Sequence, residues 1–137
     1  MIAAITDYLL KKVPDSFKGW TREAVEDYVM FHAEQSTLKI ATQQDHVVAV
    51  LVGWRQNGDQ PIEWQWQKSD PNGSHWYWHQ FAADAAVFAM AVAAKFFHDR
   101  PESAILPAIG YRNGKLTTYK NGSMPIYRVA SQKYGKC

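Results

Sequence analysis

The sequence predicts one α+β domain over residues 1–137, with a mixed, mainly antiparallel sheet and helices packed on both faces. Three observations predict this class. The length suits one domain, no repeat or low-complexity tract divides the chain, and the spacing of apolar residues changes from helical to alternating and back. Hydrophobic residues make up 47% of the chain and charged residues 20%, close to globular averages, so we expect a packed core.

The first third predicts two helices. Apolar residues recur at helical spacing over 2–13, and Pro14 ends that run. Thr21 is a suitable N-cap for a second helix, which ends near Gln35. One apolar stripe on the second helix indicates that it packs on the core.

The middle of the chain predicts four antiparallel strands separated by three turn signals: 38–42, 46–55, 62–67 and 75–81. The third of these alternates strictly between apolar and polar residues, as a strand with one wet face does. The fourth is apolar or aromatic on both faces, which predicts a buried, central strand.

The last third predicts a crossover helix and a return to the sheet. Its predicted elements are an alanine-rich helix, a strand interrupted by Pro107, a short strand and a last helix: 83–97, 104–109, 115–119 and 125–134. The turn between the two strands is Arg112-Asn113-Gly114. A run of strands followed by a crossover helix indicates a mixed sheet.

Composition argues against several classes of protein. A net charge of +2 is too small to indicate nucleic-acid binding, so no nucleic-acid partner is expected. Cys137 is the single cysteine, which excludes an internal disulfide and a thiolate metal cage. The five histidines lack ligand-type spacing, so no metal is expected. No signal peptide is visible, and the longest uninterrupted apolar run, 85–94, is half of a membrane span. We therefore expect a cytoplasmic protein without a membrane span.

A basic segment follows Arg112. Six Lys or Arg residues and no acid lie between there and Lys136. Such a segment suits an anionic partner, and it equally suits a solvated basic tail.

Residues 75–122 carry the pattern most typical of a known family. An aromatic strand, WYWHQFA at 76–82, leads into an apolar helix that ends in a charged stretch. A Gly-Lys-apolar strand at 114–119 and an Asn-Gly turn at 121–122 follow. This segment resembles the RTX-toxin-activating lysine acyltransferases, and the element order from about residue 21 is similar to the GNAT acyltransferase fold. The resemblance implies an N-acyltransferase that moves an acyl group from acyl-CoA or acyl carrier protein to a lysine or other amine, with no tightly bound cofactor.

The sequence also departs from that family. GNAT enzymes hold the coenzyme A pyrophosphate with a glycine-rich loop, but the corresponding stretch here, 80–85, has no glycine. Asp84 is an acid where the helix N-terminus would attract a phosphate. Acetyl-CoA in the usual pose is therefore not expected. The toxin acyltransferases, which use acyl carrier protein, also lack this loop. Their amino-terminal histidine has no clear counterpart in this chain.

The resemblance implies candidate catalytic residues. His79 occupies the strand position of a catalytic aspartate in the toxin acyltransferases, so it is the candidate base. A histidine titrates near pH 6.5, so about neutral pH it could accept a proton without a large pKa shift. A single histidine in an aromatic strand is more often a core or edge residue with its hydrogen bonds satisfied, so that alternative stays open. A tyrosine late in many GNAT enzymes protonates the departing thiolate, which makes Tyr119 the candidate acid, with Tyr127 and Tyr77 as alternatives.

The donor-binding candidates come from two places. Phe81, Ala82 and Ala83 belong to the stretch that corresponds to the phosphate loop. Arg112 and Lys115 belong to the basic segment, which would receive the acidic face of a carrier protein or the phosphates of coenzyme A.

A second function stays open beside acyl transfer. It is a catalytically silent GNAT-like binding module, such as a phage or mobile-element protein that docks on a host partner. The missing glycine loop and the surplus of tryptophan favour it, and the alternating Trp64 and Trp66 are the candidate contact surface. Edge strands of such a sheet pair in some dimers, so a homodimer also stays open.

Overall fold

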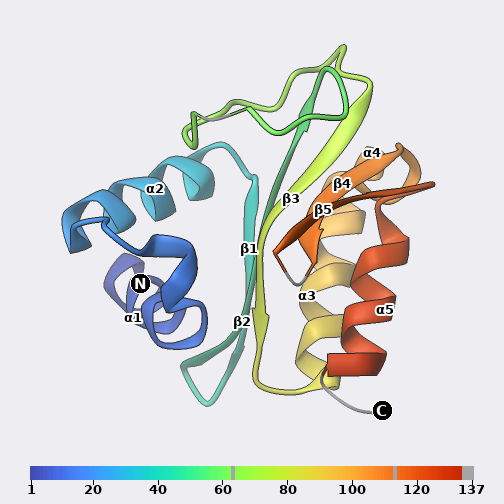
Figure 1. Cartoon of the computed structure of the whole chain (residues 1–137). Coiled ribbons are helices and arrows are strands. Elements are labelled where there is room, and N and C mark those ends of the chain that lie inside the picture. The colour runs from blue at the N-terminus through green and yellow to red at the C-terminus, as the bar shows by residue number, and fades with distance from the viewer. Residues whose placement is uncertain (63, 113, 134–137) are drawn as a thin grey trace.

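A computed structural model describes residues 1–62, 64–112 and 114–133, with side chains up to residue 128. The helices and strands follow one another along the chain (Figure 1) as α1 (Ile2–Lys12), the 3₁₀ turn η1 (Pro14–Phe17), α2 (Arg22–Glu34), β1 (Leu38–Gln43), β2 (His46–Gln56), β3 (His75–Ala83), α3 (Ala86–Asp99), α4 (Glu102–Ile105), β4 (Ala108–Arg112), β5 (Lys115–Tyr119) and α5 (Ser123–Lys133). The predicted α+β class is confirmed.

The sheet follows sequence order, β1-β2-β3-β4-β5. All neighbouring strands are antiparallel except β3 and β4, which are parallel and joined through α3. A parallel pair needs such a crossover because the chain must return to the same end of the sheet. The sheet is therefore mixed and mainly antiparallel, as predicted, with β3 at its centre.

Helices cover the two faces of the sheet. Figure 1 shows α1 and α2 on one side and α3 with α5 on the other. Each layer has its own hydrophobic core, because successive strand residues point to opposite faces. Val50, Val52 and Trp54 of β2 face the α1–α2 layer, whereas Leu51 faces α3. The prediction of helices on both faces is confirmed.

The local signals explain most element boundaries. Thr21 caps α2, since its hydroxyl accepts a hydrogen bond from the Ala24 amide. Helix α1 ends just before Pro14, as expected. The β1–β2 hairpin turns at Gln44 and Asp45, which both adopt positive φ.

The predicted strand 62–67 is wrong for the residues that the structure describes there, Glu63 lying outside them. The described positions 57–62 and 64–74 have no helix or strand, and they make up the irregular connection between β2 and β3, called the 57–74 connection. The Trp66 ring stacks on Trp20, and the Gln65 carbonyl accepts a hydrogen bond from His32. Long-range contacts with α2 and its preceding turn therefore hold this segment, in place of a ladder with a neighbouring strand.

Three further boundaries differ from prediction. β3 continues to Ala83, which pairs with Ala49, so α3 begins at Ala86 and not at 83. Residues 104 and 105 belong to the short helix α4, and β4 begins only after Pro107. The last helix begins at Ser123, and its predicted end, Tyr134, lies outside the described residues.

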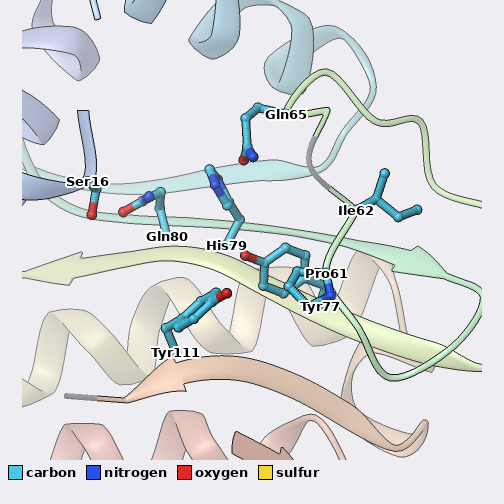
Figure 2. Close-up of a pocket in the computed structure, with 8 residues that line it drawn as sticks. All are labelled: Ser16, Pro61, Ile62, Gln65, Tyr77, His79, Gln80 and Tyr111. Carbon is cyan, nitrogen blue, oxygen red and sulfur yellow. The ribbon is translucent and has the colours of Figure 1, made fainter. Parts of the chain in front are cut away.

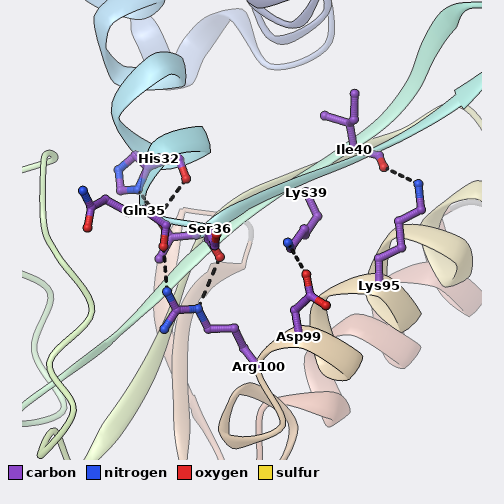
Figure 3. Close-up of polar contacts among 9 residues, drawn as sticks. His32, Gln35, Ser36, Lys39, Ile40, Lys95, Asp99 and Arg100 are labelled. Atoms are coloured by element: carbon purple, nitrogen blue, oxygen red, sulfur yellow. Dashed lines mark hydrogen bonds and ion pairs between the residues drawn. The ribbon is translucent and has the colours of Figure 1, made fainter.

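Polar contacts close the β1 edge of the sheet (Figure 3). Arg100, which follows α3, donates hydrogen bonds to the carbonyls of Gln35 and Ser36 after α2. Lys95 of α3 donates to the Ile40 carbonyl at 3.0 Å, and Lys39 pairs with Asp99. These contacts occupy groups of an edge strand and fasten α3 to it.

Gly53 lies where two indole rings cross β2. A Cβ atom at this position would meet Trp78 Cε3 at 2.5 Å and Trp76 Nε1 at 2.6 Å. Both rings are buried against α3, where Phe96 packs on them. The central strands can therefore carry these two large rings on one face only because residue 53 has no side chain.

We expect Gly53→Ala to lower the free energy of unfolding by about 2 kcal/mol, because the two buried rings would have to shift. Urea denaturation monitored by tryptophan fluorescence measures this. Gly110→Ala is the matched control, since a Cβ there would lie 3.5 Å from the Trp78 carbonyl oxygen, an ordinary contact. Equal stability of the Gly53 and Gly110 variants would contradict the packing argument.

Candidate functional site

A pocket of about 450 Å³ opens on the α1–α2 face of the sheet (Figure 2). Side chains from η1, the 57–74 connection, β3 and β4 line it: Ser16, Pro61, Ile62, Gln65, Tyr77, His79, Gln80 and Tyr111. The pocket thus joins segments that lie far apart in the sequence, and no single segment of the chain contains it.

A β-bulge at His79 sets which side chains reach the pocket. Trp78 pairs with Gly53 and Gln80 with the adjacent Val52, so His79 is an extra residue in β3. A bulge breaks the strict alternation of a strand and re-aims a side chain. His79 and Gln80 therefore both line the pocket, although they are neighbours in the sequence.

The pocket also lies where two parallel strands part. β3 and β4 pair over three residues, ending with Trp78 opposite Gly110, while β3 continues to Ala83. Tyr111 follows this last pair, on the same face as His79, and its side chain is 59% exposed. Figure 2 shows Tyr77, His79 and Tyr111 close together at this point.

His79 is held by α2. Its Nδ1 atom and the Tyr28 hydroxyl form a hydrogen bond of 2.5 Å. Burial lowers the pKa of His79 to about 3, with a further contribution from nearby His32. The pKa of His79 is therefore well below the ordinary histidine value that the sequence led us to expect, and His79 is neutral near pH 7. A base this weak is poorly matched to holding a proton at that pH.

His32 fastens the irregular connection to α2. The His32 ring is buried, with Thr37 Oγ1 at 2.7 Å from Nδ1 and the Gln65 carbonyl oxygen at 2.8 Å from Nε2. It stacks on Trp54, with ring centroids 4.9 Å apart. Since Gln65 lines the pocket, His32 holds part of the pocket wall in place. Burial lowers the pKa of His32 to about 4.

The described lining residues offer neutral hydrogen-bonding groups. Two phenols, two carboxamides, one hydroxyl and one neutral imidazole line the pocket, with no carboxylate, ammonium or guanidinium among them. Burial raises the pKa of Tyr77 to about 12, with a smaller contribution from Tyr111, so Tyr77 keeps its proton. This pocket suits an uncharged ligand with acceptor oxygens better than an ion.

The predicted catalytic pair is not brought together. His79 lines the pocket, but Tyr119 packs against the core on the α3 side of the sheet. A single ligand in the pocket cannot contact both. Of the alternatives, Tyr77 lines the pocket, whereas Tyr127 of α5 contacts Phe97 of α3.

The predicted donor-binding residues are also dispersed. Phe81, Ala82 and Ala83 are strand residues of β3, not a loop, and they pack into the cores of the two faces. Arg112 and Lys115 are opposite each other in the β4–β5 ladder, at the last cross-strand position before the turn. By strand alternation they share the face of Gly110, opposite the face of Tyr111.

Asp84 differs from its expected place in the first turn of a helix. It precedes the N-cap residue of α3, and its carboxylate accepts hydrogen bonds from Lys12 at 2.9 Å and Tyr8 at 3.0 Å. The hydrogen bond from Lys12 is the main cause that lowers the pKa of Asp84. Asp84 therefore fastens α1 to the end of β3.

Several residues of the site carry no signal in the sequence. Tyr28 belongs to the apolar stripe of α2, and nothing in that stripe marks it as the partner of a residue 51 positions later. No local pattern marks Tyr111 or Gln80 either. The strand pattern did indicate Tyr77 and His79 on one face, and the structure confirms this placement.

Neither a metal site nor a membrane helix accompanies the pocket in the described part of the chain. Within residues 1–62, 64–112 and 114–133, no group of three or more His, Cys, Asp or Glu is placed to hold a metal ion. No helix in these ranges is long and apolar enough to cross a membrane.

No protein-family model matches the chain, and no curated protein matches its sequence.

We expect stability to fall as the pH falls from about 6.5 to 4, because unfolded His32 and His79 bind protons in this window and the buried, folded side chains do not. Linkage gives up to about 3 kcal/mol for a pKa lowered from 6.5 to about 4. Urea denaturation at pH 7, 5 and 4 measures this loss. His32→Gln should weaken the pH dependence, while His46→Gln, an exposed control, should keep it. An undiminished pH dependence in the His32 variant would argue against a contribution from His32, whereas the part that His79 contributes should remain.

Proposed function

We propose that the chain is an N-acyltransferase whose pocket receives the acyl group of a thioester donor, acyl-CoA or an acyl carrier protein. The observation that carries this proposal is the convergence of His79, Tyr77 and Tyr111 on one pocket where β3 and β4 part. Neutral donors around a partly enclosed space suit a thioester carbonyl, on which negative charge develops during acyl transfer.

The proposed reaction is aminolysis of the thioester. The acceptor nitrogen attacks the carbonyl carbon, a C–N bond forms, and the C–S bond breaks. The amine releases one proton to solvent water and the departing thiolate gains one from the protein, so the reaction is balanced. Tyr111 replaces Tyr119 as the proposed proton donor to sulfur, because it lies in the pocket and is accessible. Water at the exposed phenol can return its proton.

A thermal-shift titration with acetyl-CoA, a long-chain acyl-CoA and an acyl carrier protein carrying an acyl group tests donor binding. A bound donor at about 100 times its dissociation constant adds roughly 2.7 kcal/mol of stability, a visible shift. Stabilisation by any one of the three supports the proposal and names the donor. No shift with all three contradicts it.

We expect Tyr111→Phe to lower acyl transfer to a lysine peptide by roughly 10²-fold, the usual effect of losing a general acid. The variant removes only a hydroxyl from an exposed side chain, so its melting temperature should stay near that of the parent. Mass spectrometry of the peptide measures transfer. Tyr127→Phe is the matched control, because this exposed tyrosine lies on α5, away from the pocket. Equal activity of the two variants would remove Tyr111 from the mechanism.

The exposed Trp64 favours a second candidate function, the silent binding module. This residue is 62% exposed and its ring contacts Trp66, while Trp66 is partly covered by its stack on Trp20. Only Trp64 of the predicted pair is therefore a free contact surface. Large exposed aromatics are frequent at the centre of protein interfaces.

Under this second function, Trp64→Ser should abolish binding of a partner that co-purifies with the parent chain, and no thioester should be consumed. Quantitative mass spectrometry of the co-purified proteins measures the loss. Val87→Ser, which changes an exposed apolar residue of α3, is the control and should retain the partner. Loss with both variants, or with neither, would count against a Trp64 surface.

A further inference from the structure

The Tyr28 hydroxyl is deeply buried beneath the pocket. The whole side chain has no exposed surface, and its ring is enclosed by aromatic rings: Phe17, Trp20, His32 and Trp66. Its oxygen reaches from α2 to the Nδ1 atom of His79. Among the described residues, no other hydrogen-bond partner of this hydroxyl is found.

The direction of this hydrogen bond follows from what each group can donate. A phenol has one O–H, and a neutral imidazole has one N–H and one acceptor nitrogen. Burial raises the pKa of Tyr28 well above its ordinary value, so the phenol keeps its proton. If His79 Nδ1 donated instead, the Tyr28 hydroxyl hydrogen would be buried without an acceptor, which is costly. Tyr28 therefore donates and Nδ1 accepts.

We propose that Tyr28 locks His79 in the neutral tautomer protonated on Nε2, so that His79 presents an N–H donor to the pocket and binds a carbonyl oxygen there. Tyr28 is then a positioning residue, and His79 polarises the acyl carbonyl where the sequence suggested a base. The identity of the carbonyl, that of a thioester, rests on the proposed function. The assignment of the tautomer does not rest on the proposed function.

The surroundings of Nε2 agree with a donor role. His79 lines the pocket, and within the described part of the chain no protein group hydrogen-bonds its Nε2 atom. With a pKa of about 3, the ring stays neutral at pH 7 and carries a single N–H. An N–H aimed at developing negative charge stabilises an oxyanion without any proton transfer.

Long-range proton–nitrogen NMR of the full chain at pH 7, without ligand, tests the tautomer directly. We expect a protonated Nε2 and an unprotonated Nδ1 for the ring whose signals disappear in His79→Gln. A protonated Nδ1, or nitrogen shifts averaged between the two tautomers, would overturn the proposal. The tautomer is read from the unaltered protein, and the variant serves only to assign its signals.

Tyr28→Phe should release the ring, with averaged nitrogen shifts for His79. Tyr8→Phe is the matched control, since it also removes a buried hydroxyl, one bonded to Val48 and Asp84 and not to His79. It should leave the His79 spectrum unchanged, although both variants lose stability. Parent-like His79 shifts in Tyr28→Phe would show that another group sets the tautomer and would overturn the positioning role.

His79→Gln and His79→Ala separate a donor from a base. The glutamine carboxamide can offer an N–H to the pocket but cannot accept a proton at pH 7. We expect His79→Gln to retain at least about tenfold more acyl transfer than His79→Ala. Equal loss in both would overturn the carbonyl-binding role. The two proposals can also fail separately. If NMR shows a protonated Nε2 but no thioester stabilises the chain, the tautomer assignment holds and the acyltransferase proposal is rejected.

Discussion

The hydrogen bond between Tyr28 and His79 joins the helical layer to the central strand at the candidate site. Tyr28 brings α2 over the sheet, and the bulge in β3 brings His79 up to meet it. The aromatic rings around Tyr28 exclude water from the bond, which strengthens it and lowers the basicity of the imidazole. The pocket is therefore built on a buried polar contact inside an aromatic core.

The irregular connection 57–74 depends on the same core. Trp66 packs beside Tyr28 by stacking on Trp20, and the Gln65 carbonyl accepts a hydrogen bond from His32 one helical turn after Tyr28. A connection this long without regular structure is uncommon in a compact domain, and such segments often serve binding sites. Its described residues wall the pocket because Trp20, just before α2, offers an aromatic stack and His32 of α2 offers a buried donor.

The opposite face of the sheet has a structural role. Trp76 and Trp78 fill the space beneath α3, and Gly53 provides the room that their rings need. Tyr119 belongs to this layer, which explains why it does not reach the pocket. By strand alternation, the side chains of Arg112 and Lys115 likewise lie on the face of the hairpin opposite Tyr111.

The sequence by itself determined the α+β class, the two first helices with the Thr21 cap, the β1–β2 hairpin and the central aromatic strand. These features depend on local periodicity, capping and turn residues, which neighbouring positions encode. Only the tertiary structure decided the bulge at His79, the pairing with Tyr28 and the loss of the predicted strand at 62–67. These depend on contacts between distant residues, and in each case packing against α2 or a neighbouring strand outweighed the local pattern.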